Sequence, residues 1–252
     1  MKLWTVARFT LLRLRRTRYL SAGVLLTLLV FWMVPDGEKI RGLRDLDWAY
    51  TLATYLAWFF AIWLGNSMIA ADRADGNLRS TLTRPISGIE YIGGKVLGGC
   101  VAVTILVAAF TAALIVGVLV EGIEFRGAML WYPLSLLPIH YMVVALAVAL
   151  SQWLPRFWAL ALTLIARDGL FSEQALARLG DFLGDTTLSV LEPLARVLYW
   201  LAPATSRVTI GFYDFFYTDK DISLYLIFLP YSLHYVVVAC LLAAWHLNRE
   251  EL

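Results

Sequence analysis

The chain has 252 residues, of which 60% are hydrophobic and only 16% are charged, and its mean hydropathy is +0.71. Soluble globular domains have about 45–50% apolar and about 25% charged residues. This composition therefore excludes an ordinary soluble domain and indicates an integral membrane protein. The net charge is only +2, and we expect no nucleic-acid partner.

Residues 2–18 predict an amphipathic helix that lies on the membrane surface. Leu3, Trp4 and Leu11 recur at helical spacing, and basic residues occupy the other side. Such a helix lies among the lipid headgroups and is attracted to anionic lipid. A cluster of charges that only directs insertion remains the alternative. Because no small-x-small cleavage motif follows, we expect the first apolar segment to be retained.

Six apolar segments predict six membrane-spanning helices, since a helix needs roughly 20 apolar residues to cross the hydrocarbon core. They cover residues 19–35, 48–71, 92–120, 129–154, 156–171 and 222–245. The fifth is short and extends only across Arg167 and Asp168, so whether it crosses fully stays open. The sequence thus predicts an all-α integral membrane protein with a single transmembrane domain over residues 1–252.

The distribution of charge predicts the orientation of these spans. With the N-terminus in the cytoplasm, six spans leave both termini inside. The inner segments then hold twelve of the 21 Lys and Arg residues but only five of the 19 Asp and Glu residues. An excess of Lys and Arg in short cytoplasmic segments is the usual bias of membrane proteins, so we expect both termini to be cytoplasmic.

A polar, basic segment separates the second and third spans. It predicts a short helix over residues 72–82, since Pro85 disfavours helix at Arg84. Acidic residues near the start and basic residues near the end suit the helix dipole. Ser87 and Glu90 then match the Ser-x-x-Glu capping box, which predicts a sharp start of the third span. Residues 72–86 are either a solvated connection or a surface for a soluble partner.

Residues 167–221 form the long segment before the last span. Apolar residues at helical spacing predict short helices on the extracytoplasmic side. These helices either lie flat on the outer surface or dip back into the membrane, where any non-helical backbone must be covered by protein or line a water-filled cavity. Both arrangements remain open.

Residues 72–95 resemble the loop between the second and third membrane helices of ABC type-2 transporter permeases. The places of the family pattern are filled here by Asp72, Arg73, Gly76, Leu78, Leu82, Pro85, Ile86, Ser87, Tyr91, Gly94 and Lys95. Two positions depart from it, with Asp72 where Glu is usual and Asn77 where Thr is usual. The basic N-terminal helix, the six spans, the large insertion and the charged tail extend the resemblance over the whole chain.

The resemblance implies that the chain is a transporter subunit that acts in contact with other chains. Such permeases pair two membrane subunits with two ATPase subunits, whose closure on ATP moves a short cytoplasmic coupling helix. The implied ATPase contacts are Asp72, Arg73, Asp75, Gly76, Leu78, Arg79, Leu82, Arg84 and Pro85, and Ser87 and Glu90 cap the following helix. A second permease copy or a homologous permease and membrane lipids are further partners, and a periplasmic or membrane accessory protein stays open.

The resemblance further implies export across a bacterial or archaeal cytoplasmic membrane. ATP and magnesium would bind in the partner subunit, and we expect this chain to hold no cofactor and no metal. The string from Gly88 to Val96 lacks the spacing and the hydroxyl of a phosphate-binding loop, so we expect no ATP hydrolysis here. We expect Lys95 to reach the cytoplasmic headgroups. The substrate is not predicted.

Two other classes of function remain open. A rhomboid-like serine protease needs a serine on one span and a histidine on another, and Ser67 after Gly65 with His234 is the candidate pair. We expect Ser67 and His234 to lie at different depths in the membrane. A phosphatidyltransferase fits less well, because its motif is incomplete around Asp168. The third class is a membrane scaffold that transports nothing.

Overall fold

The computed structural model describes residues 2–18, 21–25, 43–74, 86–120, 125, 127–167 and 223–250. Within these ranges the chain is helical apart from short turns and contains no strand. The helices are α1 (Lys2–Arg16), α3 (Leu43–Ala74), α5 (Gly88–Val120), α6 (Ala128–Trp153), α7 (Arg156–Arg167) and α12 (Ser223–Glu250). The all-α fold predicted from the sequence is therefore present in the part of the chain that the structure describes.

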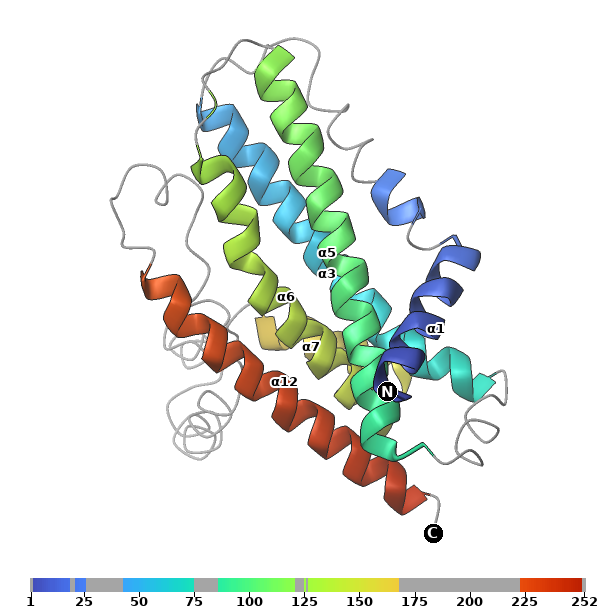
Figure 1. Ribbon diagram of the computed structural model, residues 1–252. Helices are drawn as coiled ribbons and strands as arrows, with labels where there is room; N and C mark the ends of the chain where they lie inside the picture. The colour runs from blue at the N-terminus through green and yellow to red at the C-terminus, as the bar shows by residue number, and fades with distance from the viewer. Residues whose placement is uncertain are drawn as a thin grey trace, which may run out of the picture.

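Three long helices, α3, α5 and α6, pack against one another at the centre of the molecule (Figure 1). α12 crosses on the outside of α5 and α6, whereas α1 lies along α5 and α7 packs on α3 and α6. The shared core is fully apolar at its centre, with Ile62, Leu106 and Val144 at most 2% exposed. Because lipid tails are as apolar as these side chains, close van der Waals packing rather than exclusion of water stabilises such a core in a membrane.

Contacts between helix ends define one polar end of this bundle. The end of α3 meets the start of α5 through Asp72 and Lys95. The end of α3 also meets the end of α6, where Arg73 donates to Gln152. α3 and α6 therefore finish at the end where α5 begins, as expected for antiparallel neighbours, and α1 lies beside this end (Figure 1).

Four of the described helices are long and apolar enough to cross a membrane. These stretches are Tyr50–Arg73, Gly88–Val120, Met129–Trp153 and Leu229–Arg249. Most of the predicted first span, residues 19–35, lies outside the described residues. α7 has 12 residues, about 18 Å at 1.5 Å per residue, which is shorter than the hydrocarbon core of about 30 Å. The count of six spans stays a prediction.

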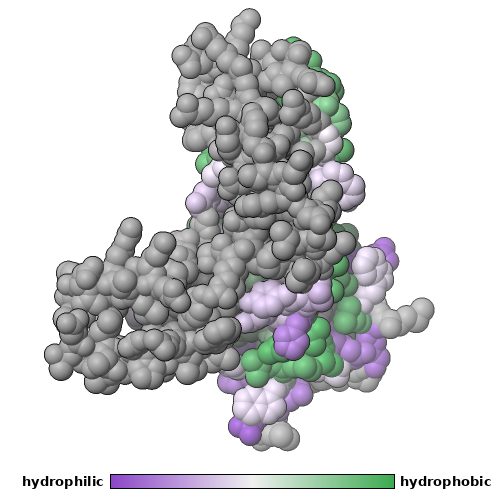
Figure 2. Space-filling view, turned by 90° about the vertical axis from the view of Figure 1, so that its left-hand side faces the viewer, coloured by the Kyte–Doolittle hydropathy of each residue, from purple (hydrophilic) through white to green (hydrophobic). Residues whose placement is uncertain are grey.

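Large apolar side chains lie exposed on the outer helices. On α12 the exposed set recurs every four residues, at Leu229, Leu233, Val237, Leu241 and Trp245. In the view from the side where α12 lies, apolar residues in green are exposed next to hydrophilic residues in purple in the lower part of the molecule (Figure 2). Such a surface suits contact with lipid or with another membrane-embedded surface.

Candidate functional site

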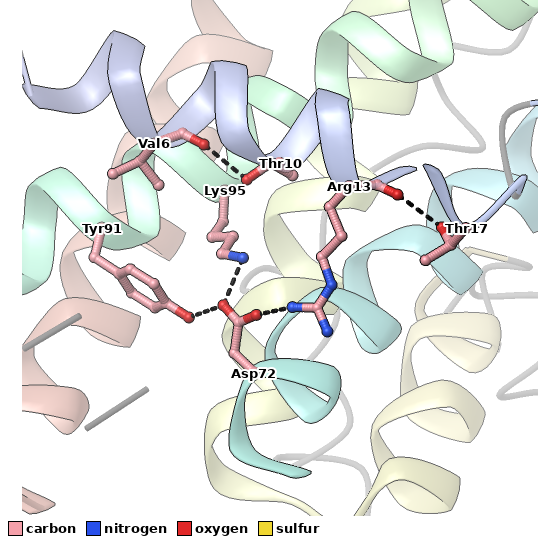
Figure 3. Close-up of polar contacts among 7 residues, drawn as sticks. All are labelled: Val6, Thr10, Arg13, Thr17, Asp72, Tyr91 and Lys95. Carbon is pink, nitrogen blue, oxygen red and sulfur yellow. Dashed lines mark hydrogen bonds and ion pairs between the residues drawn. The ribbon is translucent and has the colours of Figure 1, made fainter. Parts of the chain in front are cut away.

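A buried cluster of charges at the polar end joins α1, α3 and α5 (Figure 3). The carboxylate of Asp72 on α3 accepts a hydrogen bond from Tyr91 Oη at 2.5 Å through Oδ2. Lys95 Nζ lies 2.5 Å from the same oxygen, and the guanidinium of Arg13 on α1 pairs with Oδ1. We call Arg13, Asp72, Tyr91 and Lys95 the Asp72 cluster. It connects three helices through a single carboxylate.

The burial of this cluster makes its pairing energetically important. Asp72 and Lys95 are only 5% and 6% exposed, and Tyr91 is 1% exposed. Removing one partner of a buried ion pair leaves an uncompensated charge and typically costs about 3–5 kcal/mol. Arg13 keeps 32% of its side chain exposed, so solvent screens its pairing with Asp72 more strongly. The Asp72–Lys95 pair, which joins α3 to α5, is therefore the less screened of the two ion pairs, and we expect its loss to cost more.

The close packing of α1 on α5 brings Arg13 to this cluster. A Cβ added at Gly94 would lie 2.5 Å from Val6 Cβ and 2.9 Å from the Leu3 carbonyl oxygen. A Cβ at Gly98 would lie 2.8 Å from Thr10 Cβ. Small residues let helix backbones approach this closely. The two glycines, one turn apart, form a seam within the subunit that fixes where α1 lies on α5.

The start of α5 is held by a capping box. Glu90 N–H donates to Ser87 Oγ at 3.3 Å, and Ser87 N–H donates to Glu90 Oε2 at 3.0 Å. These reciprocal bonds satisfy two of the backbone donors that a helix start leaves unpaired. The cap thus fixes the direction in which the preceding segment enters the helix that carries Tyr91 and Lys95.

The structure gives definite positions to two of the residues implied in ATPase contact. α3 continues through Ala74, so Asp72 and Arg73 belong to the end of a long helix. Arg73 is exposed and donates to both the carbonyl and the side-chain oxygen of Gln152 at 3.3 Å. The other implied contacts lie outside the described residues: Asp75, Gly76, Leu78, Arg79, Leu82, Arg84 and Pro85. Contact of any of these residues with an ATPase stays a prediction.

Lys95 differs from its expected position. We expected its side chain to extend to the headgroups, but it is 6% exposed and turned toward Asp72. The physical reason is the carboxylate of Asp72 on the neighbouring helix. Its negative charge stabilises the buried ammonium group, which would otherwise need water around it. Sequence reasoning also missed Arg13 and Tyr91 as members of the cluster. Ionisable residues near the ends of apolar segments are the signal that could have pointed to it.

The candidate residues of the enzyme alternative make unrelated contacts. Ser67 Oγ donates to the Leu64 carbonyl at 3.1 Å, and the His234 ring contacts Tyr235 edge-on. Neither contact joins the serine to the histidine. Among the residues that the structure describes, no three His, Cys, Asp or Glu side chains gather in a way that could hold a metal ion.

Long apolar helices that pack around a buried charged cluster at one end define this chain as a multi-pass helical membrane protein. The chain belongs to the ABC-2 family of transporter proteins, whose family model matches residues 14–252. No curated protein matches the chain. Family membership makes it the membrane subunit of a transporter and implies an ABC ATPase as partner in general.

Proposed function

We propose that this chain is the permease subunit of an ABC exporter in a bacterial or archaeal cytoplasmic membrane. Two permease subunits form the substrate pathway, and a separate ATPase binds ATP and magnesium. The family match over residues 14–252 supports the transporter class. In this proposal the segment at residues 72–86 forms the ATPase contact, with Asp72 positioning it from within the subunit and with Ser87 and Glu90 fixing the start of the helix that follows.

The Asp72 cluster carries the mechanistic part of the proposal. Asp72 and Lys95 lie on either side of the segment at residues 75–85, and their ion pair joins the two helices that this segment connects. A displacement of the segment would therefore move α3 and α5 together rather than separate them. A ligand can shift a conformational equilibrium only by binding two states differently, and a rigidly joined pair of helices transmits that difference into the membrane. Because Asp72 is buried, we assign it a positioning role.

Charge reversal within the segment tests the ATPase contact. The chain is co-purified with its ATPase and reconstituted in vesicles, and Arg79→Glu is compared with Arg126→Glu, which makes the same change in a segment predicted on the opposite side of the membrane. We expect Arg79→Glu to weaken co-purification of the chain with its ATPase and to abolish the stimulation of ATP hydrolysis by the chain. We expect Arg126→Glu to have neither effect. A complex that forms and hydrolyses ATP normally with Arg79→Glu would refute the proposed contact.

The orientation has its own test. A cysteine introduced by Ser80→Cys should react with a membrane-impermeant thiol reagent only from the cytoplasmic side. The native thiols provide an internal reference, because Cys100 is buried and Cys240 is only partly exposed on membrane-spanning helices. Labelling of Ser80→Cys from outside intact cells would reverse the proposed topology and remove the ATPase contact with it.

A further inference from the structure

A cavity of about 260 Å³ lies beside the Asp72 cluster, between α1, α3, α5 and the start of α7. This is several times the roughly 30 Å³ that one water molecule occupies in the liquid. Six polar side chains line it: three hydroxyls, Thr10, Thr17 and Ser67, and three cations, Arg13, Lys95 and Arg156. The cations come from three different helices, so the fold itself gathers them at one place.

The three hydroxyl groups that line this cavity already donate their hydrogens to backbone carbonyls. Thr10 donates to the Val6 carbonyl at 2.9 Å, Thr17 donates to the Arg13 carbonyl at 3.0 Å, and Ser67 donates to the Leu64 carbonyl. Lys95 and Arg13 keep their positive charge beside Asp72, and the N–H groups of Arg156 are the donors that a bound molecule would meet. A cavity whose available donors are cationic selects an anion.

Arg156 is the one of the three cations that forms no ion pair with Asp72. Its guanidinium carbon lies 5.3 Å from the centre of the Trp63 ring, a stacking contact that orients the side chain without supplying a negative charge. A planar guanidinium donates in pairs and matches the oxygens of a phosphate group. Arg156 thus provides an oriented guanidinium that could bind a phosphate group, in a cavity that two other cations also line.

We propose that this cavity binds a phosphate group, supplied by an anionic phospholipid headgroup or by free phosphate. Its position favours the lipid, because α1 forms one wall and exposes Trp4, Phe9 and Leu12 beside the basic residues Arg8 and Arg15. Helices of this kind lie at the level of the headgroups, and basic pockets between membrane helices bind anionic headgroups. A bound headgroup would contact α1, α3, α5 and α7 at once.

Native mass spectrometry of the purified full-length chain tests this site. Phosphatidylglycerol, diacylglycerol with the same acyl chains and inorganic phosphate are titrated separately. Arg156→Gln should weaken retention of phosphatidylglycerol at least about fivefold, which corresponds to about 1 kcal/mol for one cation near a headgroup. Retention of diacylglycerol, which has no phosphate, should not change.

Arg249→Gln is the matched control, because Arg249 also stacks on a tryptophan, Trp245, at 4.1 Å but does not line the cavity. It should leave retention of phosphatidylglycerol unchanged. Arg156→Lys keeps the charge but loses the paired donors of the guanidinium, so its retention of phosphatidylglycerol should lie between those of the wild-type chain and Arg156→Gln, and this graded loss separates a binding defect from a folding defect. An unchanged thermal midpoint of Arg156→Gln provides the same separation.

The results also identify the source of the phosphate group. Retention of phosphatidylglycerol that depends on Arg156 and resists millimolar inorganic phosphate supports a lipid site. Retention of inorganic phosphate that depends on Arg156, without selective retention of phosphatidylglycerol, supports a site for the free anion. Equal retention of both ligands by the wild-type chain and Arg156→Gln would overturn the proposal. None of these measurements involves the ATPase, so a failure here is distinct from a failure of the proposed coupling.

Discussion

Lys95 Nζ lies 2.5 Å from Oδ2 of Asp72, and both residues are buried. The pair joins the end of α3 to the first turns of α5 inside an otherwise apolar bundle. Charges in such surroundings are stable only with a partner and with hydrogen bonds for the remaining lone pairs. Arg13 and Tyr91 provide those bonds, so the four side chains act as one unit.

Asp72→Asn should destabilise the protein strongly. The substitution leaves the buried Lys95 ammonium without a counter-charge, and we expect a loss of about 3–5 kcal/mol in the free energy of unfolding. Equilibrium unfolding in detergent measures this loss. Adding Lys95→Met to Asp72→Asn removes the unpaired cation and should restore part of the stability. If Asp72→Asn unfolds like the wild-type chain, the ion pair does not stabilise the α3–α5 contact.

Tyr91→Phe should lower the free energy of unfolding less than Asp72→Asn does. It removes the hydroxyl that donates to Asp72 at 2.5 Å but keeps the ring in the core. Hydrogen bonds to charged groups contribute about 1.5–3 kcal/mol.

Tyr141→Phe is the reference for this change. The Tyr141 hydroxyl lies 2.7 Å from Thr104 Oγ1, and a neutral bond of this kind contributes about 0.5–1.5 kcal/mol. We expect Tyr91→Phe to lower the free energy of unfolding more than Tyr141→Phe does. The opposite order would mean that the Asp72 carboxylate gains little from Tyr91.

Gly94→Ala should disturb the contact between α1 and α5. The new Cβ would lie 2.9 Å from a backbone carbonyl oxygen of Leu3, so the helices must move apart, and overpacking of this kind costs about 1–3 kcal/mol. Gly93→Ala is the control, since its Cβ would meet only Leu3 Cδ1 at 3.1 Å, the end of a flexible side chain. A cysteine crosslink between α1 and α5 should form more slowly in Gly94→Ala than in Gly93→Ala. Equal rates would argue against the glycine seam.

Ser87→Ala should loosen the first turn of α5. An N-cap serine contributes about 1 kcal/mol over alanine, and its hydroxyl accepts from Glu90 N–H at 3.3 Å. Amide hydrogens of the first turn should exchange faster in Ser87→Ala, whereas Ser87→Thr keeps the hydroxyl and most of the protection. Exchange that stays unchanged in Ser87→Ala would show that other contacts fix this helix start.

Local patterns in the sequence predicted the elements but not the contacts between them. The apolar segments located the long helices, and Ser87 with Glu90 identified a helix start, because both signals depend on neighbours in the chain. The Asp72 cluster depends instead on which helices pack together. Arg13 and Lys95 are far apart in sequence; the glycine seam between α1 and α5 brings Arg13 to Asp72, and the packing of α5 on α3 brings Lys95 there. Because local sequence patterns do not show that α5 packs on α3, they led us to expect Lys95 among the headgroups.

The glycine seam also limits how the molecule can move. Since Gly94 and Gly98 leave no room for a Cβ beneath α1, sliding α1 by one residue along α5 would bring larger side chains into the gap. We therefore expect α1 and α5 to move together, so that any change in the inclination of α5 carries the amphipathic α1 with it.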